Sequence, residues 1–192
     1  VLEGVLQELI TRPLEDSSVI CVPFVDFDGV IEGDQGKSRF PYDHNRDYNI
    51  GQESIYPEIK AIRNIADKGI LYGFDFHSPW HFNGGNDNVF IVEKRPHKKA
   101  EYDRFGMILE NLITEKSMKY SLKNNVPPDQ GWNSSKTPCF GCYMNDIGKA
   151  KIAFTLETAY FGTEDNIFTQ DRAVELGKCF ALAIKKYDKD TI

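Results

Sequence analysis

Short apolar runs alternate with segments of helical periodicity along this chain. Four runs have the length of buried strands, at residues 17–24, 70–76, 88–92 and 151–156. Apolar residues recur at helical spacing in residues 1–10, 55–68 and 98–119 and from residue 169 onwards. Strands that alternate with helices favour an α/β fold, and we expect three α/β/α layers with a mostly parallel or mixed central sheet. Ligands of such folds normally lie beyond the strand ends.

The size and charge of the chain limit its possible functions. With 192 residues, 41% of them hydrophobic, it can bury the core of one domain, which we expect to extend over residues 1–192. The net charge of -6 argues against a nucleic-acid partner, because neutralising phosphates requires clustered Lys and Arg. No apolar stretch approaches the roughly 20 residues that span a bilayer, so we expect a soluble chain with no membrane partner. The sequence leaves its compartment open.

The four cysteines do not identify the compartment either. Cys21 lies in the first expected strand and Cys179 on the apolar face of the last expected helix, so both are interpreted as core residues. Cys139 and Cys142 form a single C-x-x-C motif, which is a weak zinc-site signal without a second pair of ligands. A redox role would need a strand-to-helix context, which Pro138 and the surrounding loop do not supply. We expect a local disulfide or two free thiols there.

One segment resembles a phosphatase motif. The apolar run that ends in Asp26-Phe27-Asp28-Gly29 is similar to the first motif of the haloacid-dehalogenase-like phosphatases, in which two Asp side chains act beside Mg²⁺. That chemistry also needs a later Ser or Thr, a Lys and paired acids after another strand. The best later acids, Glu164 and Asp165, lie in a loop, and the segment after Gly29 lacks a helix-forming run. This interpretation is therefore disfavoured.

Polar residues suited to catalysis lie beside the expected strands. Five side chains could bind a metal, transfer a proton or recognise a carboxylate, namely those of Arg39, Asn45, Arg46, His77 and Glu157. Any one of them alone is more often structural, as a satisfied histidine, a solvated carboxylate or a surface ion pair. Their common position near strand ends makes the set a candidate site.

The order of these motifs resembles the zinc metallocarboxypeptidase family. Members of that family carry in order a Pro, Asn-Pro-Asp-Gly, an Arg and Asp-Leu-Asn-Arg, to which this chain matches Pro23, Asp26-Phe27-Asp28-Gly29, Arg39 and Asp43-His44-Asn45-Arg46. The strands of the family that bear its second zinc histidine and its catalytic glutamate are similar to Phe74-Asp75-Phe76-His77-Ser78 and Phe154-Thr155-Leu156-Glu157. The closing helix is also similar, so the resemblance covers nearly all of the chain.

The resemblance implies roles for these residues in removing C-terminal residues from peptides. Glu157 would take a proton from zinc-bound water and pass it to the leaving amine. Arg39 would polarise the scissile carbonyl and stabilise the oxyanion. Asn45 and Arg46 would hold the free carboxylate of the substrate, because a guanidinium grips a carboxylate through two charge-assisted hydrogen bonds.

The zinc site that the resemblance implies is incomplete in these 192 residues. Catalytic zinc takes three protein ligands and a water, and the family supplies two ligands through a His-x-x-Glu motif that occurs nowhere here. His77 would be the third ligand, and Asp43 would orient a zinc-bound imidazole. His81 is disfavoured as a ligand because Pro79 breaks the helix that would align it with His77. We expect an N-terminally truncated chain that binds zinc poorly, with a natural pseudoenzyme as the alternative.

Three function classes remain open. The first is a metallocarboxypeptidase, the second a non-catalytic module that binds peptides or carboxylates, and the third an amide hydrolase of small N-acyl amino acids. In each class the partner is a peptide or small amide with a free carboxylate. Residues 131–146 would line the side-chain pocket by resemblance, with four candidates: Trp132, Phe140, Tyr143 and Asp146. The side-chain preference stays open.

Overall fold

A computed structural model describes residues 1–34, 36–79 and 87–189 of the chain. Its α-helices are α1 (Leu2–Thr11), α2 (Phe27–Glu32), α3 (Pro57–Ala66), α4 (Lys99–Leu112), α5 (Phe140–Asp146) and α6 (Gln170–Lys189). Its strands are β1 (Tyr72–His77), β2 (Phe90–Val92), β3 (Ile152–Glu157), β4 (Gly162–Thr163) and β5 (Asn166–Ile167). Short 3₁₀ turns include η1 (Gly36–Ser38), η2 (His44–Arg46), η4 (Pro96–Lys98) and η5 (Leu122–Asn124).

The main sheet is mixed and has β3 at its centre. Its strand order is β1-β3-β2, with β1 parallel and β2 antiparallel to β3. Every residue of β3 is buried, as its continuous apolar run predicts for a strand covered on both faces. The three strands expected at residues 70–76, 88–92 and 151–156 are confirmed, with ends shifted by one or two residues.

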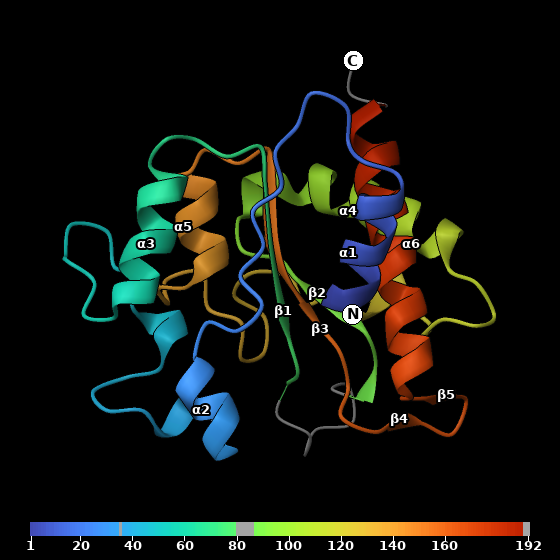
Figure 1. The fold of residues 1–192 in the computed structure, drawn as a ribbon, viewed down its shortest axis with the longest axis horizontal. Helices are drawn as coiled ribbons and strands as arrows, with labels where there is room; N and C mark the ends of the chain where they lie inside the picture. Colours follow the sequence, from blue (N-terminus) through green and yellow to red (C-terminus); the bar gives the residue numbers. More distant parts are fainter. Residues whose placement is uncertain (35, 80–86, 190–192) are drawn as a thin grey trace.

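Helices lie on both sides of this sheet. Figure 1 shows α3 and α5 on one side and α1, α4 and α6 on the other. The larger core cluster packs against the second group and includes Tyr102, Phe105, Phe154, Phe180 and Tyr187. The smaller cluster packs with α3 and α5 and includes Tyr48, Ile59, Tyr143, Met144 and Ala153. The expectation of a mixed α/β fold is confirmed.

The longest helix starts and packs as its sequence predicts. The hydroxyl of Thr169 accepts a hydrogen bond from the backbone N–H of Arg172 at 3.2 Å, which caps α6. Gly177 of α6 lies directly against α1, and a Cβ added to it would meet the carbonyl oxygen of Val1 at 2.0 Å. A Cβ on Gly4 would meet the carbonyl oxygen of Val174 at 1.9 Å. Two glycines therefore allow the backbones of α1 and α6 to touch.

The strand expected at residues 17–24 is wrong. The structure has no strand there, and the side chains of Val19, Ile20, Val22 and Phe24 are exposed. An apolar run becomes a strand only when a neighbouring strand pairs with its backbone, and none of the described strands does so. Two short helices, α2 and α5, were not expected from the periodicity. No helix in the described part of the chain is long and apolar enough to cross a membrane.

Candidate functional site

The site begins where β1 and β3 end side by side. His77 and Glu157 are the last residues of the two strands and are direct partners in their parallel pairing. Along each strand, alternate residues face the same side of the sheet, so Asp75 shares a face with His77, and Thr155 with Glu157. Ala153 of the same face packs in the cluster with α3 and α5, which places the site on that side of the sheet.

Glu157 is a buried carboxyl group. Its exposed fraction is 6%, and its Oε2 atom has no hydrogen-bond partner among the described residues. Burial raises the pKa of Glu157 to about 7, against the opposing charges of His77 and Lys94. A carboxyl group with a pKa near neutrality can both accept and return a proton, which is the property required of a general acid–base residue.

His77 is held by the carboxylate that precedes it on the strand. Its Nε2 atom lies 3.0 Å from Oδ2 of Asp75, and 38% of its side chain is exposed. Burial of the ring works against its charged form, but the charge and hydrogen bond of Asp75 raise the pKa of His77 to about 9. Thr155 Oγ1 donates a hydrogen bond of 3.4 Å to the same carboxylate oxygen and so links the pair to β3.

Asp43 lies at the edge of this group. It precedes η2, and its charge contributes to the raised pKa of His77. Its Oδ1 atom is buried without a hydrogen-bond partner among the described residues. A buried carboxylate oxygen in this state is able to accept a further N–H, which is compatible with the expected role of orienting an imidazole.

The expected carboxylate clamp lies on η2, beside α5. Asn45 Oδ1 accepts a hydrogen bond of 2.8 Å from the backbone N–H of Phe140, the first residue of α5. Arg46 Nη1 donates to the carbonyl oxygen of Asn45 at 3.3 Å. The described residues give Arg46 no carboxylate within ion-pair distance, so its guanidinium is available for an added anion.

Arg39 is engaged in a paired contact. Its Nε and Nη2 atoms donate to the two carboxylate oxygens of Asp26, each at 2.9 Å, and Nη1 lies 3.5 Å from Asp34. The hydrogen bond from Arg39 lowers the pKa of Asp26. Asp26 Oδ2 is also 3.7 Å from His44 Nδ1, which connects the pair to η2. The structure therefore holds Arg39 near the clamp through Asp26.

The same contacts explain the motif that resembled a phosphatase. Asp26 does not end a strand; it caps α2 by accepting from the N–H of Gly29 at 3.1 Å, and it pairs with Arg39. Asp28 is exposed on the first turn of α2. The carboxylates are therefore not presented by a buried strand, and this observation removes the main support for that interpretation.

The described residues do not form a zinc site. Among them, no group of three or more His, Cys, Asp or Glu side chains is arranged to hold a metal ion. His77, the expected ligand, has its Nε2 atom 3.0 Å from Oδ2 of Asp75. His81 lies outside the described residues.

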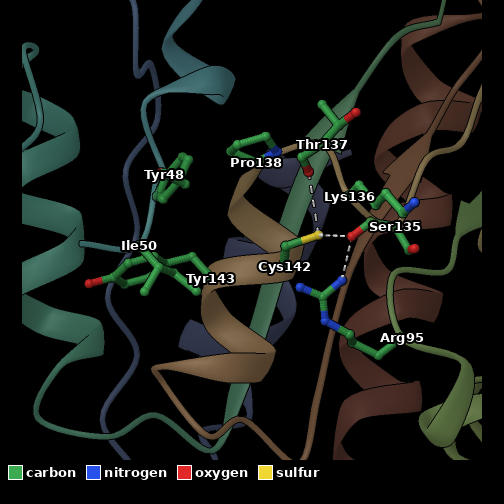
Figure 2. A pocket seen from close by; sticks show the side chains of 9 residues that line it. All are labelled: Tyr48, Ile50, Arg95, Ser135, Lys136, Thr137, Pro138, Cys142 and Tyr143. Atoms are coloured by element: carbon green, nitrogen blue, oxygen red, sulfur yellow. Dashed lines mark hydrogen bonds between the residues drawn. The ribbon is translucent and has the colours of Figure 1, made fainter. Parts of the chain in front are cut away.

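The expected pocket segment borders a real cavity. A cavity of about 190 Å³ lies beside this segment. Its lining side chains, drawn in Figure 2, are Tyr48, Ile50, Arg95, Ser135, Lys136, Thr137, Pro138, Cys142 and Tyr143. Of the four candidates, Tyr143 lines it, while Asp146 pairs with Arg95. Phe140 packs on Tyr48, and Trp132 packs on Phe90. Neither His77 nor Glu157 lines this cavity, so it is separate from the site at the strand ends.

Two charged residues near the site were missed from the sequence. Asp75 could have been found from the strand period, because it must share the face of His77. Lys94, which is 9% exposed and acts electrostatically on Glu157, had no such signal. It lies two residues after β2, at the start of a short basic run that local sequence does not connect with the strand ends.

Comparison with known proteins supports the fold. No protein-family model matches the chain, and no curated protein matches it. Among solved structures, the chain is similar to a metallo-carboxypeptidase from Burkholderia cenocepacia, with a TM-score of 0.65 and 16% sequence identity. The similarity covers 89% of this chain and 45% of that one, so the chain spans less than half the length of the structure it matches. At this identity the likeness shows a carboxypeptidase-like fold alone.

Proposed function

We propose that this chain belongs to a peptidase-like hydrolase of metallocarboxypeptidase type, built as a three-layer α/β/α domain, that acts on peptides with a free C-terminal carboxylate. The observation that supports it best is the buried Glu157, with a pKa of about 7, beside His77 at the ends of adjacent parallel strands. Perturbed carboxyl groups of this kind concentrate at active sites, and strand ends are where such folds bind ligands. The likeness in fold supports the same conclusion.

Recognition of the substrate would fall to η2. Arg46 would bind the terminal carboxylate through its guanidinium, with Asn45 beside it holding the turn against α5 through Phe140. Arg39 would act on the scissile carbonyl through Nη1, the nitrogen that does not contact Asp26. A cation at that position stabilises the negative charge that develops on the carbonyl oxygen.

Proton transfer would fall to Glu157. In its ionised form it would accept the proton of the attacking water, and in its protonated form it would donate that proton to the leaving amine. Its buried position keeps both forms accessible near neutral pH. Zinc activation of the water would need ligands beyond those of the described residues, so we assign no step to the metal.

One observation favours a second candidate, a module that binds carboxylates without hydrolysis. Among the described residues, the guanidinium of Arg46 has no carboxylate partner and no group of metal ligands is present, and Nε2 of His77 contacts Asp75. Such a module would need only Asn45 and Arg46 to bind the carboxylate. Both candidates therefore bind the same ligand, and only the hydrolase cleaves it.

Recognition is tested by comparing a short peptide with a free C-terminus and the same peptide amidated, using calorimetry. We expect the free acid to bind more tightly, and Arg46→Ala to lower its affinity by roughly 10- to 100-fold while leaving the amide unchanged, because a charge-assisted pair is lost. Arg12→Ala is the matched control, since Arg12 is an exposed arginine at the C-terminal end of α1 that forms a local ion pair with Glu8. Equal binding of both peptides by the unmodified chain would contradict both candidates.

Turnover is tested with matched peptides and N-acyl amino acids, with zinc added, on the chain and on the protein extended by any coding sequence that precedes Val1. Release of the C-terminal residue, lost in Glu157→Gln, is the expected result for the hydrolase. Binding without release in both proteins would support the binding module. Cleavage of N-acyl amino acids alone would replace the peptidase proposal by that of a small-amide hydrolase.

A further inference from the structure

Two thiols meet where α5 begins. Cys139 is the residue before the helix and Cys142 lies in its first turn, and both are unpaired, buried thiols. Residues three apart on a helical turn have neighbouring side chains, and here the Cys142 thiol acts on the pKa of Cys139. The Cα separation of such positions falls within the range that a disulfide spans, so closing one needs little movement.

A buried cation lies beside this pair. Lys94 donates from Nζ to Asn133 Oδ1 at 2.9 Å, and the described residues offer it no carboxylate within ion-pair distance. Its side chain packs against α5 at Gly141, where an added Cβ would meet Lys94 Cγ at 2.9 Å. The hydrogen bond from Cys142 and the charge of Lys94 both lower the pKa of Cys139, against burial. A buried ammonium with a neutral partner is well placed to stabilise a thiolate.

The second thiol reaches a cavity. In Figure 2 the sulfur of Cys142 points toward the segment 135–138, at 3.6 Å from the carbonyl oxygen of Thr137 and 4.0 Å from that of Ser135. The cavity that it lines has a volume of about 190 Å³, which admits a small molecule. Arg95 lines the same cavity. Interaction with Cys139 and burial raise the pKa of the Cys142 thiol, and the charge of Arg95 opposes them.

We propose that Cys139 and Cys142 form a redox-active dithiol, which a small hydroperoxide entering this cavity converts to an intramolecular disulfide and a dithiol reductant restores. The other two cysteines differ from the pair in position. Cys179 is packed in the apolar core of α6, and Cys21 lies in the segment before α2. The proposal is independent of the hydrolase function.

The chemistry balances without a further reactant. Cys142 first gives its proton to the Cys139 thiolate. The Cys142 sulfur then attacks the peroxide, so that an S–O bond forms and the O–O bond breaks. The alkoxide or hydroxide that leaves takes the proton from Cys139. The Cys139 thiolate then attacks the Cys142 sulfenic acid, the S–S bond forms, the S–O bond breaks, and hydroxide leaves to be protonated by solvent. Two thiols and one peroxide become a disulfide, water and an alcohol or a second water.

The first test uses a Cys21→Ser, Cys179→Ser double variant, which keeps only the pair. We expect hydrogen peroxide to remove two hydrogen atoms from the intact mass, peptide mapping to link residues 139 and 142, and dithiothreitol to restore both thiols. Thiols that stay reduced until the protein is unfolded, or that pass directly to sulfinic acid, would overturn the proposal.

The second test assigns roles within the pair. Cys139→Ser should form a Cys142 sulfenic acid more slowly, because the thiolate that takes the proton of Cys142 is missing, but dimedone should trap it because no thiol resolves it. Cys142→Ser should leave Cys139 unreactive because Cys139 does not line the cavity. Lys94→Met should slow oxidation by roughly tenfold, because less thiolate is present, whereas Lys60→Met on the surface of α3 should not. Circular dichroism checks that each variant is folded. An untrapped Cys142 in Cys139→Ser, or an oxidation rate unchanged in folded Lys94→Met, would contradict the proposal.

Discussion

Burial and acidic neighbours shift the pKa values of the two residues at the strand ends. Burial raises the pKa of Glu157, with a smaller contribution from Asp75. Against burial of the ring, Asp75 and then Asp43 raise the pKa of His77. The group therefore holds protons more tightly than its members would in water. His77 and Glu157 were predicted from the sequence as site residues. The contact of Asp75 with His77 follows from the period of the strand, because the two residues share a face. The Arg39–Asp26 pair was not predictable, because it joins two irregular segments.

Glu157→Gln tests the buried carboxyl group through stability. The folded pKa of about 7 lies above the ordinary value of 4.5, so the native chain takes up a proton on folding between these values and loses stability as pH rises through them. The neutral, isosteric amide has no such dependence. Above pH 7 we expect the variant to be more stable by up to roughly 3 kcal/mol, measured by urea denaturation below and above the window. Parallel stability curves for the two proteins would show that Glu157 titrates normally.

Asp26→Asn tests the paired contact with Arg39, for which the pH dependence of stability has the opposite sign from that of Glu157. The hydrogen bond from Arg39 lowers the pKa of Asp26 below its ordinary 3.8, so its contribution to stability is present above that value and is lost as pH falls through the folded pKa. Asn can still cap α2. We expect the variant to lose less stability in acid than the native chain does. Asp28→Asn, at an exposed position of the same helix, should leave the loss of stability at acid pH unchanged. If both variants reduced this loss equally, the cause would be the change in net charge and not the contact with Arg39.

At the scale of the helices and strands, close packing and tertiary contacts decide what periodicity leaves open. The helices α3, α4 and α6 and all three strands of the main sheet were predicted, because each has a long periodic segment or a compact apolar run. Residues 17–24 have the same apolar composition but no pairing partner, and α5 is too short to show a period. The first residue of α5, Phe140, donates its backbone N–H to Asn45 of η2. This contact joins distant parts of the chain, so local sequence could not predict it.

Gly177→Ala tests the contact between α1 and α6. Alanine normally stabilises a helix interior relative to glycine by roughly 1 kcal/mol. Here the added methyl group would meet the backbone of Val1 and Val5, so we expect a net loss of about 1–3 kcal/mol, measured by chemical denaturation. Lys178→Ala, the next position of α6, should change stability by less than about 0.5 kcal/mol. A stabilised Gly177→Ala variant would show that the two helices are not in contact.

At the scale of the whole molecule, two core clusters share one sheet. The larger contains the aromatic residues of α4, α6 and the inner face of β3, and the smaller joins α3, α5 and the opposite face. The alternation of strands and helices predicted this arrangement in outline. The sequence could not show how residues 13–25 run, because that segment makes no backbone hydrogen bond to the rest of the described chain.

Limited proteolysis tests that description. Among the described residues, we expect chymotrypsin to cleave first within 13–25, after Leu14 or Phe24, because this segment lacks backbone hydrogen bonds and Phe24 is 54% exposed. Mass spectrometry of early fragments identifies the bonds. The helices α4 and α6 should stay intact at that stage. Early cleavage within either helix, before any in 13–25, would contradict the fold.

The parallel pairing of β1 with β3 also determines when the site can exist. His77 and Glu157 are direct partners in the sheet but stand at positions 77 and 157, 80 residues apart along the chain. During synthesis at 5–20 residues per second, roughly 4–16 s separate the two residues. The histidine half emerges first and has no carboxylate to share its strand end, and the two halves meet only after β3 has inserted beside β1. The pairing of these two side chains therefore cannot form before residue 157 has been synthesised.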